Sequence, residues 1–168
     1  PLEDYVYYSQ LLQAEALASA YRLWKRQWQG PKKEYCSGVL VWQTNDCWPV
    51  TSWAICDYYL RPKHSYFTIK REMAPVTIGM TRREHKHPKN KYTRVDIDTK
   101  IQVEIWGSNL NLEDVTVDCV VKAWDVETGK ETYSQTVSSD LVLQSNRSTE
   151  IKTLDVPVEK PDADLEAR

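Results

Sequence analysis

The residues with the clearest chemical potential in this sequence are three tryptophans in one short segment. Trp42, Trp48 and Trp53 lie in the run W-Q-T-N-D-C-W-P-V-T-S-W, which also holds Asn45 and Asp46. An indole combines a flat apolar face with one N–H donor, and amide and carboxylate groups bind hydroxyls. Because connecting segments are usually small and polar, large rings beside an acid indicate a binding surface. Such a surface suits a sugar; the alternative is that the rings pack in the interior.

Catalytic motifs are missing from the same sequence. It has no glycine-rich phosphate loop, no G-x-S-x-G or H-E-x-x-H segment, and no Cys/His pairing that indicates a nucleophile. Glycoside hydrolysis needs two carboxyl groups, about 5–5.5 Å apart in a retaining enzyme. Asp46 and Asp57 lie near the tryptophans, but their spacing does not set them face to face. The residues therefore predict no catalytic apparatus in this chain and no cofactor.

The four cysteines, Cys36, Cys47, Cys56 and Cys119, form neither a C-x-x-C pair nor a zinc pattern with histidine. No metal site is expected. Their even number permits disulfides, but Cys119 lies on the apolar phase of a strand-like stretch, where a buried free thiol is the simpler interpretation. The disulfide state stays open.

Two helices and one strand are predicted around the tryptophan-rich segment. Residues 5–29 lack glycine and proline and predict a long helix, ended by Gly30 and Pro31. The apolar spacing of this helix predicts one buried stripe, formed by Tyr8, Leu11, Leu12, Ala16, Ala20, Leu23 and Trp24. Residues 38–42, G-V-L-V-W, are typical of a parallel strand buried on both faces. A second helix is expected over residues 62–73.

The order helix, buried strand, loop, helix is typical of an α/β barrel or a doubly wound sheet. One parallel strand with two helices cannot close a core, because each element keeps an apolar face without a neighbour. Residues 1–75 are therefore predicted to be the last piece of a larger α/β domain.

After Pro75 the hydrophobic period changes to two, as in half-buried antiparallel strands. Strand-like pieces cover residues 76–80, 94–105, 115–123, 132–137, 141–143 and 151–156. Their spacing is typical of an immunoglobulin-like sandwich, which takes about seven strands in roughly 100 residues. Because only five or six are expected over residues 76–168, the sandwich is predicted to be truncated.

Two further segments have alternative interpretations. Residues 82–91 are strongly basic but lack interleaved aromatic residues and a third metal ligand, so a solvated loop between two strands is predicted rather than a nucleic-acid or metal motif. The triplet Asn146-Arg147-Ser148 matches the N-glycosylation pattern, so Asn146 is a possible glycosylation site if the protein is secreted.

Composition narrows the function classes. The 168 residues carry a net charge of -2, with 41% hydrophobic and 27% charged residues, which excludes a disordered chain and a polybasic nucleic-acid binder. No apolar run reaches the roughly 18–20 residues that cross a bilayer, so no membrane partner is expected. The chain begins at Pro1 rather than Met, and an upstream portion is expected to be missing.

The run over residues 39–54, with the segments at 57–59, 61–63 and 70–75, resembles the β-mannosidases of glycoside hydrolase family 2, especially the fungal members. The ungapped W-Q-x-N-D-x-W-P-x-x-S-W motif carries the resemblance. In that family a (β/α)8 catalytic barrel precedes C-terminal immunoglobulin-like domains. The resemblance implies that residues 1–75 are helix 7, strand 8 and helix 8 of the barrel, and that residues 76–168 are an immunoglobulin-like sandwich.

The resemblance also implies an activity: retaining exo-hydrolysis of terminal non-reducing β-D-mannose from manno-oligosaccharides. Sites of such barrels lie at the C-terminal ends of strands, so Trp42 is expected to line the pocket of the terminal sugar. Asp46, Trp48 and Trp53 are further substrate-binding candidates, with Asp46 either binding a hydroxyl or anchoring the loop. Both catalytic glutamates are expected upstream, since no Asn-Glu or Glu-Phe-Gly motif occurs. The chain alone is expected to be inactive and to need the remainder of the enzyme.

Other interpretations stay open. One is a non-catalytic carbohydrate-binding or interaction module, although an orphan parallel strand argues against an autonomous module. Another is a different family 2 hydrolase, a β-glucosaminidase, β-galactosidase or β-glucuronidase; the tryptophan-rich motif favours mannose. The lack of a clear disulfide framework favours an intracellular, cytoplasmic location over a secreted one.

Overall fold

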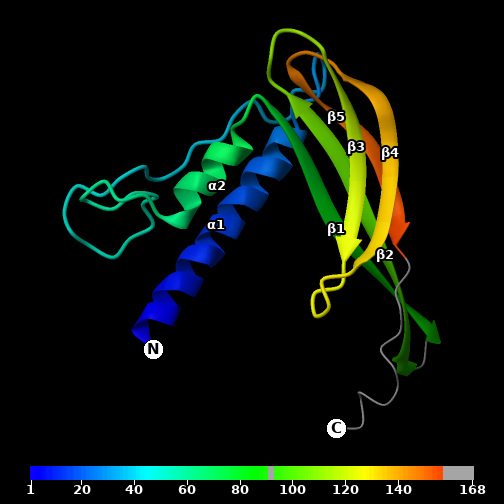
Figure 1. Ribbon diagram of the computed structural model, residues 1–168, viewed down its shortest axis with the longest axis horizontal. Coiled ribbons are helices and arrows are strands. Elements are labelled where there is room, and N and C mark those ends of the chain that lie inside the picture. Colours follow the sequence, from blue (N-terminus) through cyan, green and yellow to red (C-terminus); the bar gives the residue numbers. More distant parts are fainter. Residues whose placement is uncertain (91–92, 157–168) are drawn as a thin grey trace.

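The computed structural model describes residues 1–90 and 93–156, with side chains left undescribed over residues 87–99. Two helices lie on one side and the strands on the other (Figure 1). The elements in chain order are α1 (Leu2–Arg26), α2 (His64–Glu72), β1 (Val76–Asn90), β2 (Thr93–Asn109), β3 (Val115–Trp124), β4 (Glu131–Leu143) and β5 (Arg147–Val156). Neither helix is long and apolar enough to cross a membrane.

Both predicted helices are present, but the predicted apolar stripe of α1 is not the face that α1 buries within the described residues. The buried residues of α1 are Ala14, Ala18 and Tyr21, whereas Tyr8 is 65% and Leu12 73% exposed. In the part of the chain that the structure describes, α2 covers one face of α1, and alanines let the two helices approach closely. Tyr8 and Leu12 lie on faces of α1 that no described element covers.

Residues 38–42 do not form the predicted strand. Residues 38–41 have no strand assignment. Val39 and Val41 pack against the small core of Tyr21, Ile55 and Ile69, while Leu40 is 98% exposed. A parallel strand forms only when neighbours accept and donate its backbone hydrogen bonds, and the described residues supply no such neighbour. The apolar pattern alone therefore does not make a strand.

The β-rich part is mostly strand, in two antiparallel sheets, as the period of two predicted. One sheet has the order β1-β2-β5 and the other pairs β3 with β4. The buried residues Ile105, Cys119 and Leu154, one from each of three strands, form the core between the sheets. The stretches 132–137 and 141–143 belong to one strand, β4, because a bulge absorbs the break. There Asp140 has φ 50° and its N–H donates to Asp118 Oδ1 at 2.9 Å.

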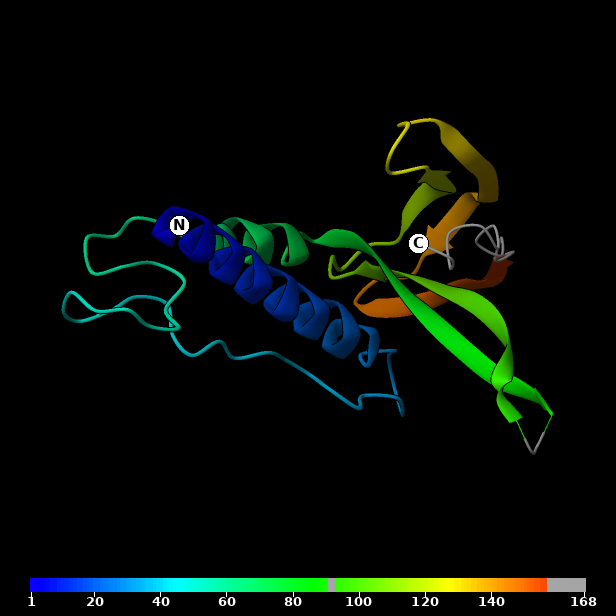
Figure 2. The ribbon, with the colours of Figure 1, turned by 90° about the horizontal axis from the view of Figure 1, so that it is seen from below.

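The charged segment at residues 82–91 is a strand up to Asn90 rather than the predicted loop, and residue 91 lies outside the described residues. Strand β1 pairs with β2 through Arg82, opposite Val103, and on to His87, opposite Asp98. The pair forms a long hairpin arm that projects away from the rest of the molecule (Figure 2). The predicted loop is wrong because β2, in which apolar and polar residues alternate, pairs with this segment through the backbone even though the segment is highly charged. Charged side chains on an edge strand also discourage aggregation.

Arg26 joins the end of α1 to the sandwich. Its guanidinium donates to both carboxylate oxygens of Glu150 and to Glu104 Oε2, each at 2.6 Å, and lies over the Trp106 ring at 4.4 Å from the centroid. The hydrogen bond from Arg26 lowers the pKa of Glu104 below its ordinary value of 4.5. Nearby, Trp28 O accepts the Ser148 N–H at 2.7 Å. These contacts set the direction of α1 relative to the sheets.

Replacing Arg26 by methionine is expected to lower the free energy of unfolding by about 1–2 kcal/mol at pH 7, because Glu104, whose side chain is 19% exposed, loses one of its two cations and keeps Arg83, whose Nε lies 2.6 Å from Oε1. Since the folded pKa of Glu104 is lowered, its contribution is fully present above the ordinary pKa and is lost as pH falls through the lowered value. Urea unfolding should therefore show a smaller difference at pH 3 than at pH 7. The control is Lys122→Met, which breaks an exposed 3.0 Å pair with Glu131 and should cost about 0.5 kcal/mol. Equal effects of the two substitutions would contradict the prediction.

Cys119 is a free thiol in the sandwich core, as its position in the apolar phase predicted. It is 2% exposed, and burial raises the pKa of the thiol. A serine hydroxyl at this position would be buried without an assured partner, so Cys119→Ser should lower the free energy of unfolding by about 1–3 kcal/mol. Cys47, which is exposed, provides the control. If Cys119→Ser and Cys47→Ser unfold at the same urea concentration, the thiol contributes no packing.

Candidate functional site

Residues 42–57, which we name the tryptophan loop, fold back on themselves. The Ile55 N–H donates to Gln43 O at 3.1 Å and the Cys56 N–H donates to Thr44 O at 2.8 Å. The Trp42–Gln43 peptide bond is cis. These two hydrogen bonds clamp the base of the loop, so its middle residues form a closed turn.

Both helices hold the tryptophan loop in place. Gln13 of α1 donates from Nε2 to Trp53 O at 2.6 Å, and its Oε1 accepts from Ser65 of α2 at 3.1 Å. Lys63, just before α2, donates from Nζ to Ser52 O at 3.0 Å. Gln13 and Lys63 thus fix the backbone carbonyls of Trp53 and Ser52.

The three predicted indoles lie on the surface of the described structure. Trp42 is 76% exposed, Trp48 64% and Trp53 61%. Since none of them is in the described core, the packing alternative does not explain them within this chain. Their faces are open to a ligand or to a part of the protein beyond the described residues.

Asp46 differs from the indoles because its side chain faces inward. It is 3% exposed, and Oδ1 accepts the Ser52 hydroxyl at 2.6 Å. The Ser52 oxygen in turn accepts the Ala54 N–H at 3.0 Å. Among the residues that the structure describes, the buried Oδ2 has no hydrogen-bond partner. The sequence singled out Asp46 but missed Ser52, whose only signal was its place in the same motif.

Asp57, the other acid near the loop, serves the next turn. Its Oδ1 accepts the N–H groups of Tyr59 and Arg61, each at 2.9 Å, and Oδ2 accepts Arg61 Nε at 2.6 Å. The backbone hydrogen bond from Arg61, followed by that residue's guanidinium, lowers the pKa of Asp57. These bonds stabilise the turn that contains Asp57, whereas Asp46 is hydrogen-bonded within the tryptophan loop.

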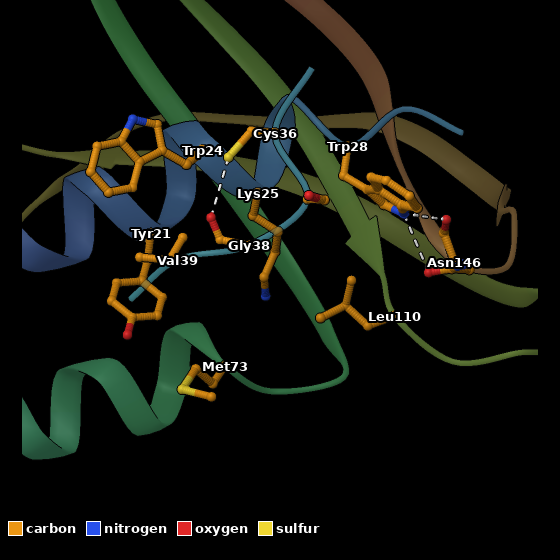
Figure 3. A pocket seen from close by; sticks show the side chains of 11 residues that line it. Tyr21, Trp24, Lys25, Trp28, Cys36, Gly38, Val39, Met73, Leu110 and Asn146 are labelled. Atoms are coloured by element: carbon orange, nitrogen blue, oxygen red, sulfur yellow. Dashed lines mark hydrogen bonds between the residues drawn. The ribbon is translucent and has the colours of Figure 1, made fainter. Parts of the chain in front are cut away.

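A cavity of about 300 Å³ lies at the junction of the helices and the sandwich (Figure 3). Sequence reasoning missed it because its walls come from distant segments: Tyr21, Trp24, Lys25, Trp28, Cys36, Ser37, Gly38, Val39, Met73, Leu110 and Asn146. Most of this lining is apolar. The Lys25 amine, whose pKa burial lowers, already donates to Glu72 O at 2.5 Å and Thr77 Oγ1 at 3.0 Å. The cavity therefore offers an apolar surface with few polar groups.

Asn146, the possible glycosylation site, lies at this junction and away from the tryptophan loop. The Trp28 indole N–H donates to Asn146 O at 2.8 Å and, more weakly, to Oδ1 at 3.3 Å (Figure 3). Ser148, the third residue of the pattern, is 5% exposed and shares a 2.6 Å hydrogen bond with Ser108. Asn146 itself is exposed, so glycosylation there stays a prediction.

Comparisons with known proteins agree with one another. A family profile described as Mannosidase Ig/CBM-like domain matches residues 102–166. "Beta-mannosidase B" of Thermothelomyces thermophilus is 67% identical over all 168 residues, which are 20% of that protein. "Beta-mannosidase B" of Aspergillus terreus is 38% identical over 151 residues, 89% of this chain and 17% of that protein. The chain thus spans about a fifth of the length of these curated relatives.

A solved structure extends the similarity to the arrangement of the elements. The crystal structure of the β-D-mannosidase from Dictyoglomus thermophilum matches with a TM-score of 0.63 and 26% identity. The match covers 96% of this chain and 17% of the other. It therefore includes the helices and the tryptophan loop as well as the two sheets.

Proposed function

The chain belongs to the β-mannosidases of glycoside hydrolase family 2, corresponding to a C-terminal portion of such an enzyme, and we propose that the intact protein is a retaining exo-β-mannosidase. It would remove terminal non-reducing β-D-mannose from manno-oligosaccharides. The observation that carries this proposal is the 67% identity to a β-mannosidase over the whole chain, including the tryptophan loop. The three exposed indoles of this loop, whose flat faces suit a pyranose ring, are consistent with it.

We further propose that residues 1–75 are the end of a (β/α)8 catalytic barrel and residues 76–168 an immunoglobulin-like domain. The two helices support this, because they run side by side in the same direction (Figure 1). Ser65 at the start of α2 contacts Gln13, while Glu72 at its end pairs with Arg22 at 2.7 Å. Parallel neighbouring helices require an extended return segment between them, and residues 38–42 supply one. This is the geometry of consecutive units in a barrel.

The unpartnered apolar surface of this part fits the same proposal. Tyr5 is 72% exposed, Leu12 73% and Leu40 98%. In a barrel, strand 8 lies between strands 7 and 1 and is covered by helices, so such residues gain partners from the remainder of the enzyme. The partners proposed for this chain are thus a β-mannoside substrate and the rest of its own protein.

In the proposed reaction this chain positions the sugar, and groups elsewhere do the covalent chemistry. Trp42 lies at the end of the proposed strand 8, where its flat face can pack on the C–H face of the terminal mannose. Trp48 and Trp53 would line the mouth of the pocket. Of two glutamates outside this chain, one attacks the anomeric carbon while the other protonates the leaving oxygen and then activates water. Residues 1–168 alone should therefore be inactive.

The test is hydrolysis of aryl β-mannoside, β-glucoside, β-galactoside, β-glucosaminide and β-glucuronide by the full-length enzyme. We expect cleavage of the mannoside and little of the others. Preferential cleavage of another sugar would replace mannosidase by a different family 2 activity, and binding of mannose without cleavage of any glycoside would favour the non-catalytic module. Activity from material that contains only these 168 residues by mass would contradict the assignment of the glutamates.

A further inference from the structure

We propose that Asp46 is a positioning residue, which holds the tryptophan loop closed through Ser52 and makes no contact with the sugar. The inference rests on the proposed function only in taking the loop to line the sugar site. The contacts that support it are those of the loop itself.

The carboxylate is withdrawn from solvent. Asp46 is 3% exposed, and its Oδ2 is buried as well. By contrast Trp48 and Trp53, on either side of Ser52 in the sequence, are 64% and 61% exposed. A sugar hydroxyl that reaches the indole faces therefore does not reach the carboxylate unless the loop opens.

The hydrogen bonds around Ser52 have a defined direction. The Ala54 N–H can only donate, so the Ser52 oxygen accepts there at 3.0 Å. The single hydroxyl proton of Ser52 is then donated to Asp46 Oδ1 at 2.6 Å. A bond from a neutral hydroxyl to a carboxylate is stronger than one between neutral groups. Asp46 thereby orients Ser52, and Ser52 orients the Ala54 amide.

This chain of bonds completes the closure of the loop. The Ile55 and Cys56 amides clamp its base, and Lys63 and Gln13 hold the carbonyls of Ser52 and Trp53. Among the described residues, the hydrogen bond between Asp46 and Ser52 is the side-chain bond that joins the two arms of the loop. Without it, the segment that carries Trp48 keeps the local bond from Asn45 Nδ2 to Asp46 O at 3.2 Å and no described side-chain bond to the other arm.

The first test compares Asp46→Ala, Ser52→Ala and the double variant in the full-length enzyme, with an aryl β-mannoside as substrate. If the bond acts as a unit, each single variant should lower kcat/KM about tenfold, and the double variant should be no worse than Asp46→Ala. Ser52→Thr, which keeps the hydroxyl, should restore most of the activity. If Asp46 binds the sugar instead, Ser52→Ala stays close to the wild type while Asp46→Ala falls much further, and the proposal is wrong.

A second readout does not depend on activity. Hydrogen exchange of the peptide that covers residues 43–57, followed by mass spectrometry on the full-length protein, should be faster in both single variants than in the wild type. Thr51→Ala is the control, because Thr51 is the exposed hydroxyl next to Ser52; it should leave exchange unchanged. Unchanged exchange in both variants overturns the positioning role even if the enzyme cleaves mannosides. Faster exchange in an enzyme that cleaves no mannoside keeps the closure role of Asp46 and rejects the proposed function.

Discussion

Replacing Trp42 by alanine in the full-length enzyme should lower kcat/KM for an aryl β-mannoside by about 30- to 100-fold. Trp42 is 76% exposed, so in the proposed site a face of its ring is available to a sugar. Removing an aromatic face that packs on a pyranose forfeits about 2–3 kcal/mol of apolar contact, and each 1.4 kcal/mol is a factor of ten. Because most of the ring is outside the described core, the stability of the protein should change little.

Two controls sharpen the Trp42 prediction. Trp42→Phe keeps a flat ring and should retain activity within about tenfold of the wild type. Trp124→Ala removes another exposed indole, 54% exposed, from strand β3 of the sandwich, and should leave kcat/KM unchanged. Steady-state kinetics on the three variants distinguishes the outcomes. If Trp42→Ala behaves like Trp124→Ala, Trp42 does not contact the sugar.

Introducing a methyl group at Gly79 should be among the most damaging single changes in the sandwich. A Cβ at this position would lie 2.3 Å from Cε2 of Trp106, with two more indole atoms at 2.4 and 2.5 Å. Trp106 is 1% exposed, and the Arg26 guanidinium lies over its ring. A shift of the indole toward the guanidinium would displace Arg26 from its two glutamates. Gly79→Ala is therefore expected to lower the free energy of unfolding by about 3 kcal/mol, the upper part of the range for overpacked cores.

Gly129→Ala separates this clash from a backbone effect. Gly129 has φ 67° but nothing within 4 Å of a Cβ, so alanine there should cost only about 1 kcal/mol of conformational strain. Urea unfolding followed by tryptophan fluorescence measures both variants. A loss for Gly79→Ala no larger than that for Gly129→Ala would mean that Trp106 and its neighbours repack freely. In that case the packing between α1 and the sandwich rearranges more readily than its hydrogen bonds indicate.

The sequence determined the local features of this protein. A run without glycine or proline indicated α1, because helix propensity acts residue by residue. The period of two after Pro75 indicated antiparallel strands and the buried Cys119. The W-Q-x-N-D-x-W-P-x-x-S-W motif was enough to indicate the family, and it singled out Trp42, Asp46, Trp48 and Trp53 as candidates for the site.

What the sequence left open depends on which segments meet in space. The stripe that α1 buries depends on which of its apolar faces has a partner, and Ala14 and Ala18 are buried where Leu12 is exposed. The segment at residues 38–42 has an apolar strand pattern, but a strand also needs a neighbour for its backbone hydrogen bonds. Asp46 is hydrogen-bonded to Ser52, six positions away in the sequence. Arg26 is hydrogen-bonded to Glu104 and Glu150, which lie much further along the chain. Propensity and periodicity describe one segment at a time, so only the tertiary structure decided these contacts.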